Sequence, residues 1–438
     1  MATAPSTKTS ATGRPGRKLG LFATLALVMG NMIGTGVFLL PAQLAPFGWN
    51  AVLGWVVTIG GALCLAHVLA SLAAARPHAV GVAALVQCEL GPLAGFLIGF
   101  SFWVSVWTGV CSIAVGGVSY LSALVPVLGN YPEVATLSLI WLVTAINLAG
   151  VRAAGGFQVV TLLLKLVPLV VVFALIVMQL AARGGEALAP LPVEGFSLPL
   201  VNAAAALALW AMVGFEAACA AGDKIDNPGV TIPRATMIGA ALVGLFYLLV
   251  CSGVALMLPA DEVAASNAPF ELFVATFWSP GPAAFVALFA AISAIGALNG
   301  WVLVQGETPR DMARGGLLPR WLAAATPAGT PRRALLVSSL LASALIIANG
   351  GRGMGGLFAF MALLSTCATL WLYLACAAAA ARARVALPTV ILGSVYAVWA
   401  LWGAGVEAVG YSVVLMLAGL PLWWWARREQ RLLLEQAV

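Results

Sequence analysis

The sequence predicts an all-α integral membrane protein with twelve transmembrane helices. Of its 438 residues, 62% are hydrophobic and only 8% are charged, whereas soluble domains carry about 25% charged residues. Apolar stretches, many of them about as long as the 20 residues that a membrane span requires, follow one another along the chain. So apolar a surface cannot be kept in water, which excludes a soluble enzyme and a nucleic-acid-binding protein.

Charges and turn residues delimit the predicted spans. These lie at approximately 19–45, 50–75, 93–124, 134–150, 155–181, 199–221, 235–258, 281–307, 334–349, 355–381, 386–405 and 410–426. The first two spans share an uncharged run, which the Pro and Gly of residues 46–50 divide by a turn. Residues 1–18 carry four basic side chains and precede an uncleaved first span, so they are not a secretory signal.

The positions of the basic residues support this topology. With the N-terminus in the cytoplasm, 18 of the 21 Lys and Arg residues lie in cytoplasmic segments, Arg183 and Arg352 lie outside, and Lys165 lies within a span. Because cytoplasmic loops are enriched in Lys and Arg, both termini are expected to be cytoplasmic.

Several function classes lack the residues that they need. The seven cysteines are scattered without a CxxC pair and the two histidines are too few for a metal site, so no disulfide framework, metal or cofactor is expected. The spans contain no paired aspartates, Ser–His pair or HExxH helix for an intramembrane protease, and no arginine repeat for a voltage sensor. A transporter is favoured over a channel, and an enzyme is not expected.

Two spans contain glycine-interrupted segments that predict broken helices. The first span holds GNMIGTG at 30–36 and the sixth holds WAMVGFE at 210–216. Breaks at matching positions of two halves indicate a transporter's binding site, because the backbone groups that leave the helix can bind a ligand. Glycine that only permits close helix packing is the alternative.

These segments carry a family resemblance. The stretch GNMIGTGVFLLPAQLA at 30–45 resembles the G-[SNT]-x-[IM]-G-[ST]-G-[IV]-F segment of the amino acid–polyamine–organocation transporters. The segment at 210–216, with DNP at 226–228 and IPRA at 232–235, matches their sixth-helix signature and the following loop. The resemblance runs from Lys18 to the last span and is greatest to bacterial arginine/agmatine antiporters and basic amino acid/polyamine antiporters.

The resemblance implies a LeuT-type fold with two inverted five-helix repeats, two extra helices, and breaks in helices 1 and 6. The expected parts are a cytoplasmic tail at 1–18, the first repeat at 19–181, the second repeat at 199–381, helices 11 and 12 at 386–426 and a cytoplasmic tail at 427–438. It also implies a bacterial inner-membrane protein with an amino acid or amine substrate, and a homodimer as in many relatives.

The resemblance further implies a substrate site at the membrane midplane. The substrate carboxylate would meet Ile33, Gly34, Thr35 and Gly36, in agreement with the anion affinity of helix N-termini. The amino group would meet carbonyls near Met32 and Val213. Further implied substrate contacts are Ser105, Val106, Val110, Trp210 and Ser365, and the implied gate residues are Phe102, Trp210, Glu216, Trp301, Phe358 and Tyr373.

Three features of the sequence, which involve four residues, depart from the arginine/agmatine pattern. Helix 3 has Val106 and Val110 where those proteins have a cysteine and an asparagine, and a guanidinium with five donors would miss the asparagine. Phe102 replaces the inner-gate tyrosine. Lys165 resembles the lysine that replaces a sodium ion in proton-coupled permeases and amino-acid exchangers; a lysine that snorkels to water is the alternative.

Glu216 is the only carboxylate well within a predicted span, so it is a functional candidate by default. Its partner would be a proton, a substrate ammonium or Tyr373, and with Lys165 it is the candidate for proton and charge coupling. A static structural carboxyl is the alternative.

The leading hypothesis is therefore an antiporter of the arginine/agmatine type that works by alternating access. A sodium-independent, proton-coupled permease or exchanger for neutral or broad-range amino acids is the alternative. A membrane sensor or channel that binds amino acids is the alternative from another class.

Overall fold

The computed structural model describes residues 19–76, 78–79, 81–149, 152–216, 225–326 and 329–436. Within these ranges the chain is helical, and the only strand-like feature is an isolated bridge between Leu19 and Ile225. The helices are α1 (Leu21–Met32), α2 (Gly36–Leu44), α3 (Trp49–Ala75), α4 (Val82–Leu90), α5 (Pro92–Leu124), α6 (Val127–Asn130), α7 (Pro132–Ala149), α8 (Arg152–Arg183), α9 (Leu198–Met212), α11 (Pro228–Met257), α12 (Ala260–Ala265), α13 (Pro269–Phe277), α14 (Pro280–Arg314), α15 (Arg332–Asn349), α16 (Gly353–Arg382), α17 (Leu387–Leu417) and α18 (Leu420–Gln436). Short 3-10 turns lie at Ala45–Phe47, Gly184–Ala187, Arg320–Ala323 and Gly350–Arg352.

The helices have the length and composition of membrane spans. Eight helical segments of the described residues are long and apolar enough to cross a membrane, and α1 with α2 makes a ninth that is bent by 46°. Two of the eight, Arg332–Arg382 and Leu387–Leu432, contain more than one helix. The all-α membrane fold is thus confirmed, while the count of twelve spans stays a prediction.

Both predicted helix breaks are present. Helix α1 ends at Met32, and Ile33 has an extended backbone with ψ of 91° before α2 begins at Gly36. Helix α9 ends at Met212, Val213 is extended with ψ of 141°, and Gly214 has φ of +125°. The predicted turn between the first two spans is also confirmed, since Gly48 has φ of +53° and α3 begins at Trp49.

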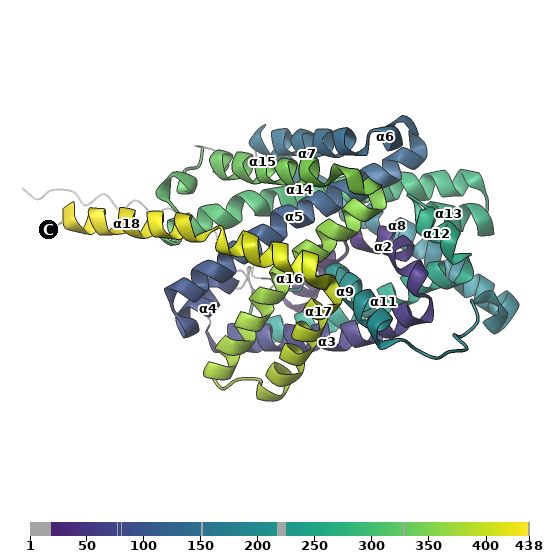
Figure 1. Cartoon of the computed structure of the whole chain (residues 1–438), viewed down its shortest axis with the longest axis horizontal. Coiled ribbons are helices and arrows are strands. Elements are labelled where there is room, and N and C mark those ends of the chain that lie inside the picture. The colour runs from purple at the N-terminus through teal and green to yellow at the C-terminus, as the bar shows by residue number, and fades with distance from the viewer. Residues whose placement is uncertain are drawn as a thin grey trace, which may run out of the picture.

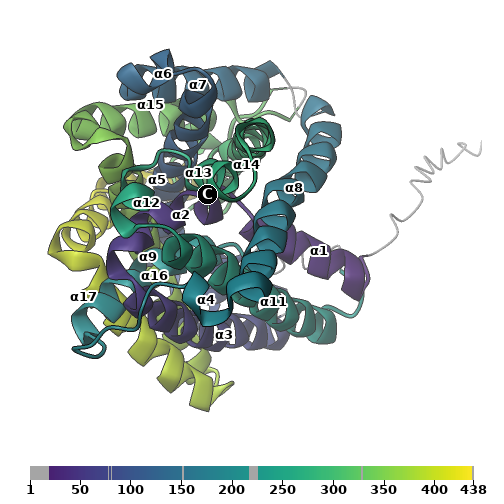
Figure 2. The same cartoon turned by 90° about the vertical axis from the view of Figure 1, so that its right-hand side faces the viewer.

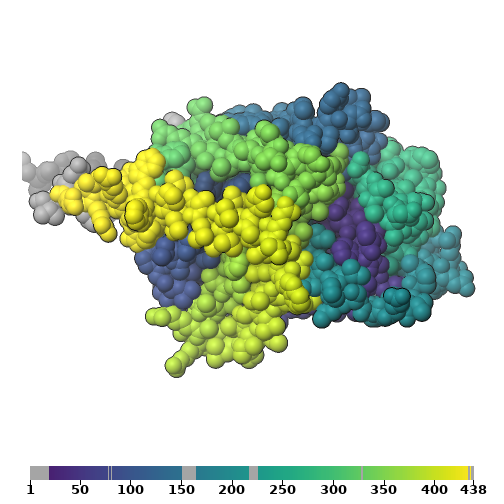
Figure 3. Space-filling view, viewed as in Figure 1, coloured from purple at the N-terminus to yellow at the C-terminus, as the bar shows by residue number. Residues whose placement is uncertain are grey.

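The C-terminal helices begin and end at other residues than the predicted spans, while the cytoplasmic position of the tail stays a prediction. The expected gap between helices 11 and 12 is only a kink within α17, where Gly405 has φ of 84° and ψ of 157°. The expected tail at 427–438 is helical as far as Gln436, because it continues α18. Figures 1 and 3 show α18 running out beyond the bundle at the C-terminal end. Two hydrogen bonds attach it, from Gln430 Nε2 to Gly316 O (3.0 Å) and from Arg320 N to Glu429 Oε2 (3.0 Å).

Helix α5 forms the centre of the bundle. Its most extensive contacts are with α14 and α16, and nearly all of its apolar central part is buried. Hydroxyl groups join it to neighbouring helices: Ser101 Oγ donates to Ala368 O (2.8 Å) and Ser112 Oγ donates to Phe358 O (3.1 Å). Such bonds hold helices together where lipid offers no hydrophobic driving force between them.

Close packing of α3 against α17 depends on Gly61. A Cβ atom at this position would lie 2.1 Å from the Tyr396 ring, so a side chain there must displace a buried aromatic residue. We expect Gly61→Ala to lower the free energy of unfolding by about 1–3 kcal/mol, measured as a fall in the thermal unfolding temperature of the purified protein. The neighbouring Gly60→Ala is the matched control, because Gly60 is exposed and its Cβ would meet no atom within 4 Å. An equal effect of the two variants would contradict the packing role.

Helix α1 lies apart from α2 at the edge of the molecule. Helix α1 packs against α11, and Figure 2 shows α1 at the edge of the molecule, while α2 lies further inside. The bend at residues 33–35 therefore directs the first half of this span outward.

Candidate functional site

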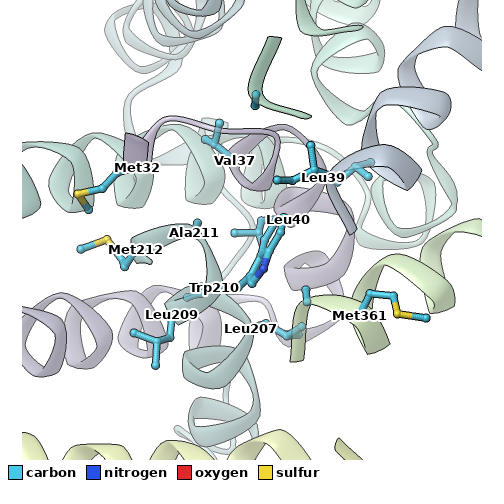
Figure 4. Packing of buried hydrophobic residues seen from close by; sticks show 14 of the residues in the cluster. Met32, Val37, Leu39, Leu40, Leu207, Leu209, Trp210, Ala211, Met212 and Met361 are labelled. Carbon is cyan, nitrogen blue, oxygen red and sulfur yellow. The ribbon is translucent and has the colours of Figure 1, made fainter. Parts of the chain in front are cut away.

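The two helix breaks contact each other, although 180 residues separate Gly34 from Gly214. A Cβ on Gly214 would lie 3.0 Å from Asn31 O, and a Cβ on Gly36 would lie 2.9 Å from Trp210 Cζ3. Figure 4 shows the Trp210 side chain projecting from α9 toward Leu40 of α2. Glycine is needed at both positions, so that the backbones and the indole ring can approach this closely.

The start of α2 supplies unpaired donors. The first amides of a helix have no intrahelical acceptor, and the positive end of the helix dipole adds to their attraction for an anion. Thr35, directly before α2, is 1% exposed and its Oγ1 has no hydrogen-bond partner. A buried hydroxyl without a partner is costly, which indicates that this end of α2 is prepared for a ligand oxygen.

The end of α1 is held by Tyr247 of α11. The Tyr247 hydroxyl donates to Met32 O at 3.0 Å, so one lone pair of this carbonyl is already engaged. The expected contact of Met32 O with a substrate ammonium would use the other lone pair.

A cavity of about 50 Å³ lies between the breaks. It brings together most of the predicted substrate contacts: Met32, Gly34, Thr35, Gly36, Ser105, Val106, Trp210, Val213 and Ser365. Ile33 is buried but is not among the described residues that line it. The volume is well below the roughly 300–1,000 Å³ of ligand sites, so an amino acid could enter only after the surrounding side chains move.

Helix α5 contributes a different set of residues from the one predicted. Its lining residues are Phe102, Ser105, Val106, Gly109 and Ile113. At 100° per residue, these five side chains lie on one stripe along the helix. Val110 lies outside the stripe, about 40° around the helix axis from its nearest member, Val106. Val110 is fully buried and is not among the described residues that line this cavity, so its expected contact with the substrate stays a prediction that the cavity lining does not support.

The sequence interpretation missed four lining residues: Asn31, Gly109, Ile113 and Ala211. Helical periodicity counted from Phe102 would have found Gly109 and Ile113.

Both α5 and α16 leave acceptor oxygens at the cavity, because Ser105 Oγ donates to Phe102 O (2.7 Å) and Ser365 Oγ donates to Ser105 O (2.8 Å). With their hydrogens engaged, these hydroxyls can only accept from a ligand.

Aromatic side chains stand on two sides of the cavity. The rings of Trp210 and Phe358 meet edge to face with centroids 5.3 Å apart. Phe102 and Trp301 line both this cavity and a second, larger one, as does Asn31. The predicted gate residues Phe102 and Trp301 therefore lie at the junction of two cavities.

The second cavity, here called the vestibule, has a volume of about 650 Å³. Its lining includes Gln87 of α4, Lys165 of α8, Glu216 after α9, and Thr308 and Asp311 of α14. Asp311 and Gly315 are exposed, so the vestibule reaches the surface at the C-terminal end of α14. The charge distribution predicts that this side is cytoplasmic.

Glu216 lies at the vestibule and is 5% exposed. Its Oε2 accepts hydrogen bonds from Tyr373 Oη and Gly214 N, both at 3.1 Å, whereas its Oε1 is buried without a partner among the residues that the structure describes. Tyr373 also stacks on Phe215, with ring centroids 5.1 Å apart. Of the three partners considered for Glu216, the structure therefore shows the Tyr373 hydroxyl, and the roles of a proton and of a substrate ammonium at this carboxylate stay predictions.

Lys165 faces the same vestibule from α8. Its side chain is 3% exposed, so the ammonium does not snorkel to the protein surface. Among the described residues, Lys165 has no ion pair or hydrogen bond. In the same part of the chain, no three or more His, Cys, Asp or Glu side chains lie close enough together to hold a metal ion.

Known proteins with similar sequences are amino acid permeases and polyamine transporters. Residues 19–432 match the model of a family described as amino acid permease. The chain is 32% identical over 333 residues to the cadaverine/lysine antiporter of Escherichia coli strain K12, which covers 76% of this chain and 74% of the relative. It is 24% identical over 426 residues to the putrescine transporter PotE of the same strain, covering 93% and 95% of the two chains.

A second putrescine transporter PotE, from Haemophilus influenzae, is 24% identical over 419 residues and covers 93% of this chain and 96% of its own. The family model and the relatives all describe transporters. The chain therefore belongs to the amino acid permease family within the amino acid–polyamine–organocation superfamily, and it is a multi-pass membrane transporter of amino acids or polyamines, not an enzyme.

Proposed function

We propose that this protein is an antiporter that exchanges a cationic amino acid for a polyamine across a bacterial inner membrane. The observation that carries this proposal is the unpaired Thr35 hydroxyl at the N-terminus of α2, with the buried carboxylate of Glu216 after the second break. The first group suits a carboxylate and the second suits an ammonium. The named activity of the cadaverine/lysine antiporter supports exchange of this kind.

The geometry suggests how alternating access would proceed. The vestibule shares Phe102 and Trp301 with the central cavity and includes the exposed residues Asp311 and Gly315, and the Trp210 ring that lines the central cavity packs against Phe358. This arrangement corresponds to a state open toward the predicted cytoplasm. Cytoplasmic termini follow from the distribution of basic residues, and a homodimer is part of the proposal by analogy with many relatives.

The exchanged pair is proposed as lysine/cadaverine-like or arginine/agmatine-like. Acceptor oxygens of Ser105 and Ser365 suit the side-chain ammonium or guanidinium of either. The helix-3 asparagine of the arginine/agmatine proteins is absent here, while the relative with 32% identity exchanges lysine and cadaverine by name. Lysine with cadaverine is therefore the pair to test first.

A neutral amino acid is the second candidate substrate. Val106, Gly109 and Ile113 give the cavity an apolar wall, and no carboxylate is among its described lining residues. This wall would accept an aliphatic side chain as readily as the methylene chain of lysine.

A counterflow assay with the purified protein in proteoliposomes tests the proposal. Vesicles loaded with cadaverine should accumulate labelled lysine in sodium-free buffer, because Lys165 is proposed to supply the charge of the displaced sodium ion. Excess arginine, agmatine and leucine, added one at a time outside, would rank the substrates. Uptake that needs sodium would contradict the role of Lys165, and leucine as the sole competitor would favour the neutral candidate.

The lining of α5 predicts a shift in specificity. Val106→Asn should add one hydrogen-bonding group to the cavity wall and raise the affinity for arginine relative to leucine by about tenfold, or 1–1.5 kcal/mol. Competition in the same assay measures the ratio. Val110→Asn is the matched control on the same helix, and it should leave the ratio unchanged because Val110 does not line the cavity. If Val110→Asn changed the arginine-to-leucine ratio and Val106→Asn did not, Val110 and not Val106 would contact the substrate.

A further inference from the structure

The vestibule contains two buried groups of opposite charge that do not pair with each other. Lys165 is 3% exposed and Glu216 is 5% exposed, and both line this cavity. The structure records no salt bridge between them, although Glu216 Oε1 has no hydrogen-bond partner within the described part of the chain. Buried charges are normally paired with each other or with a ligand.

The vestibule also has the space that the central cavity lacks. Its volume of about 650 Å³ lies within the range of small-molecule sites, roughly 300–1,000 Å³. Asn31, Phe102 and Trp301 separate it from the central cavity and belong to the lining of both. A ligand that leaves the helix breaks would therefore reach the charged pair next.

We propose that Lys165 and Glu216 form a second substrate site in the vestibule, which binds the zwitterionic end of an amino acid. The substrate carboxylate pairs with the Lys165 ammonium, and its α-ammonium pairs with Glu216 Oε1. This inference deepens the proposed function and rests on it for the identity of the amino acid.

The site distinguishes the two substrates of the proposed exchange. An amino acid satisfies both charges, whereas a polyamine has no carboxylate and brings a second cation toward Lys165. The ammonium therefore favours the amino acid in the vestibule and opposes retention of the polyamine there. Polyamine that enters from this side would pass to the central cavity instead.

Equilibrium binding to the full-length protein in nanodiscs, with labelled L-lysine, L-leucine and cadaverine, tests the second site. In a Gly34→Leu background, which removes the central site, we expect weaker but measurable binding of both amino acids. Adding Lys165→Met should weaken binding of L-lysine and L-leucine about tenfold or more, whereas Lys165→Met alone, with the central site intact, should leave cadaverine binding no weaker. Lys165→Arg should retain amino-acid binding, and Arg183→Met, which removes an exposed cation outside the vestibule, is the matched control.

The outcomes separate the two proposals. Equal loss of amino-acid and cadaverine binding in Lys165→Met would make Lys165 a structural residue and overturn the second site. Absence of amino-acid binding in Gly34→Leu protein that keeps its thermal unfolding temperature would overturn it as well, while lysine/cadaverine exchange by the wild type would still stand. Lysine and leucine binding that depends on Lys165, without any lysine/cadaverine exchange, would support the vestibule site and reject the exchange proposal.

Discussion

Gly34→Leu is expected to reduce substrate binding by about a hundredfold or more, or about 3 kcal/mol, in a protein that still folds. The nearest atom to a Cβ at this position is Met32 O at 4.0 Å, so the new side chain meets no packed neighbour. It extends instead into the cavity beside Thr35 and the free amides of α2. A β-carbon also favours re-formation of the helix across the break. Binding of labelled lysine to the purified protein measures the effect.

The same substitution on the lipid-facing surface provides the control. Gly60 is exposed on α3 and has no atom within 4 Å of its Cβ position, so Gly60→Leu should bind substrate like the wild type. Thermal unfolding of both variants would show whether Gly34→Leu is folded. Undiminished lysine binding by folded Gly34→Leu protein would remove the substrate from the helix break.

Glu216→Gln is expected to slow exchange about tenfold and to abolish its dependence on pH. A hydrogen bond to a charged group contributes about 1.5–3 kcal/mol, and the amide keeps the shape of the side chain but cannot take up a proton or carry charge. In the wild type, a proton and a cationic substrate compete for the same carboxylate. The apparent affinity for lysine or cadaverine should therefore weaken as the pH is lowered across the range in which exchange is measured.

The measurement is exchange by proteoliposomes over this pH range, with the concentration of the cationic substrate varied at each pH. Glu262→Gln is the control, because Glu262 is an exposed carboxylate on α12 and should not affect the profile. If wild type and Glu216→Gln had the same rates and the same pH profile, the carboxyl would be a structural partner of Tyr373 and the cationic-substrate proposal would lose its main support.

Local sequence features were sufficient to predict the membrane class and the two helix breaks. Twenty-residue apolar runs have few ways to satisfy their backbone other than as helices, and the glycines at 30–36 and 210–216 mark where these helices stop. The turn before Trp49 follows from Gly48 in the same way, since its φ of +53° is accessible to glycine at little cost.

Side-chain neighbours across the bundle required the tertiary structure. The sequence named both Val106 and Val110, but only the rotation of α5 about its axis placed the first at the cavity and buried the second elsewhere. That rotation depends on the packing of α5 against α14 and α16, and no local pattern records it.

Lys165 and Glu216 also show which features the sequence predicts and which require the tertiary structure. Each was identified from the sequence alone, because a charged residue inside an apolar span is costly and thus functional by default. Nothing in the sequence places them at one cavity, since they lie 51 residues apart on different helical segments. The folded bundle brings both to the vestibule without an ion pair between the two, because packing of whole helices, and not the chemistry of either residue, determines how far apart two side chains lie.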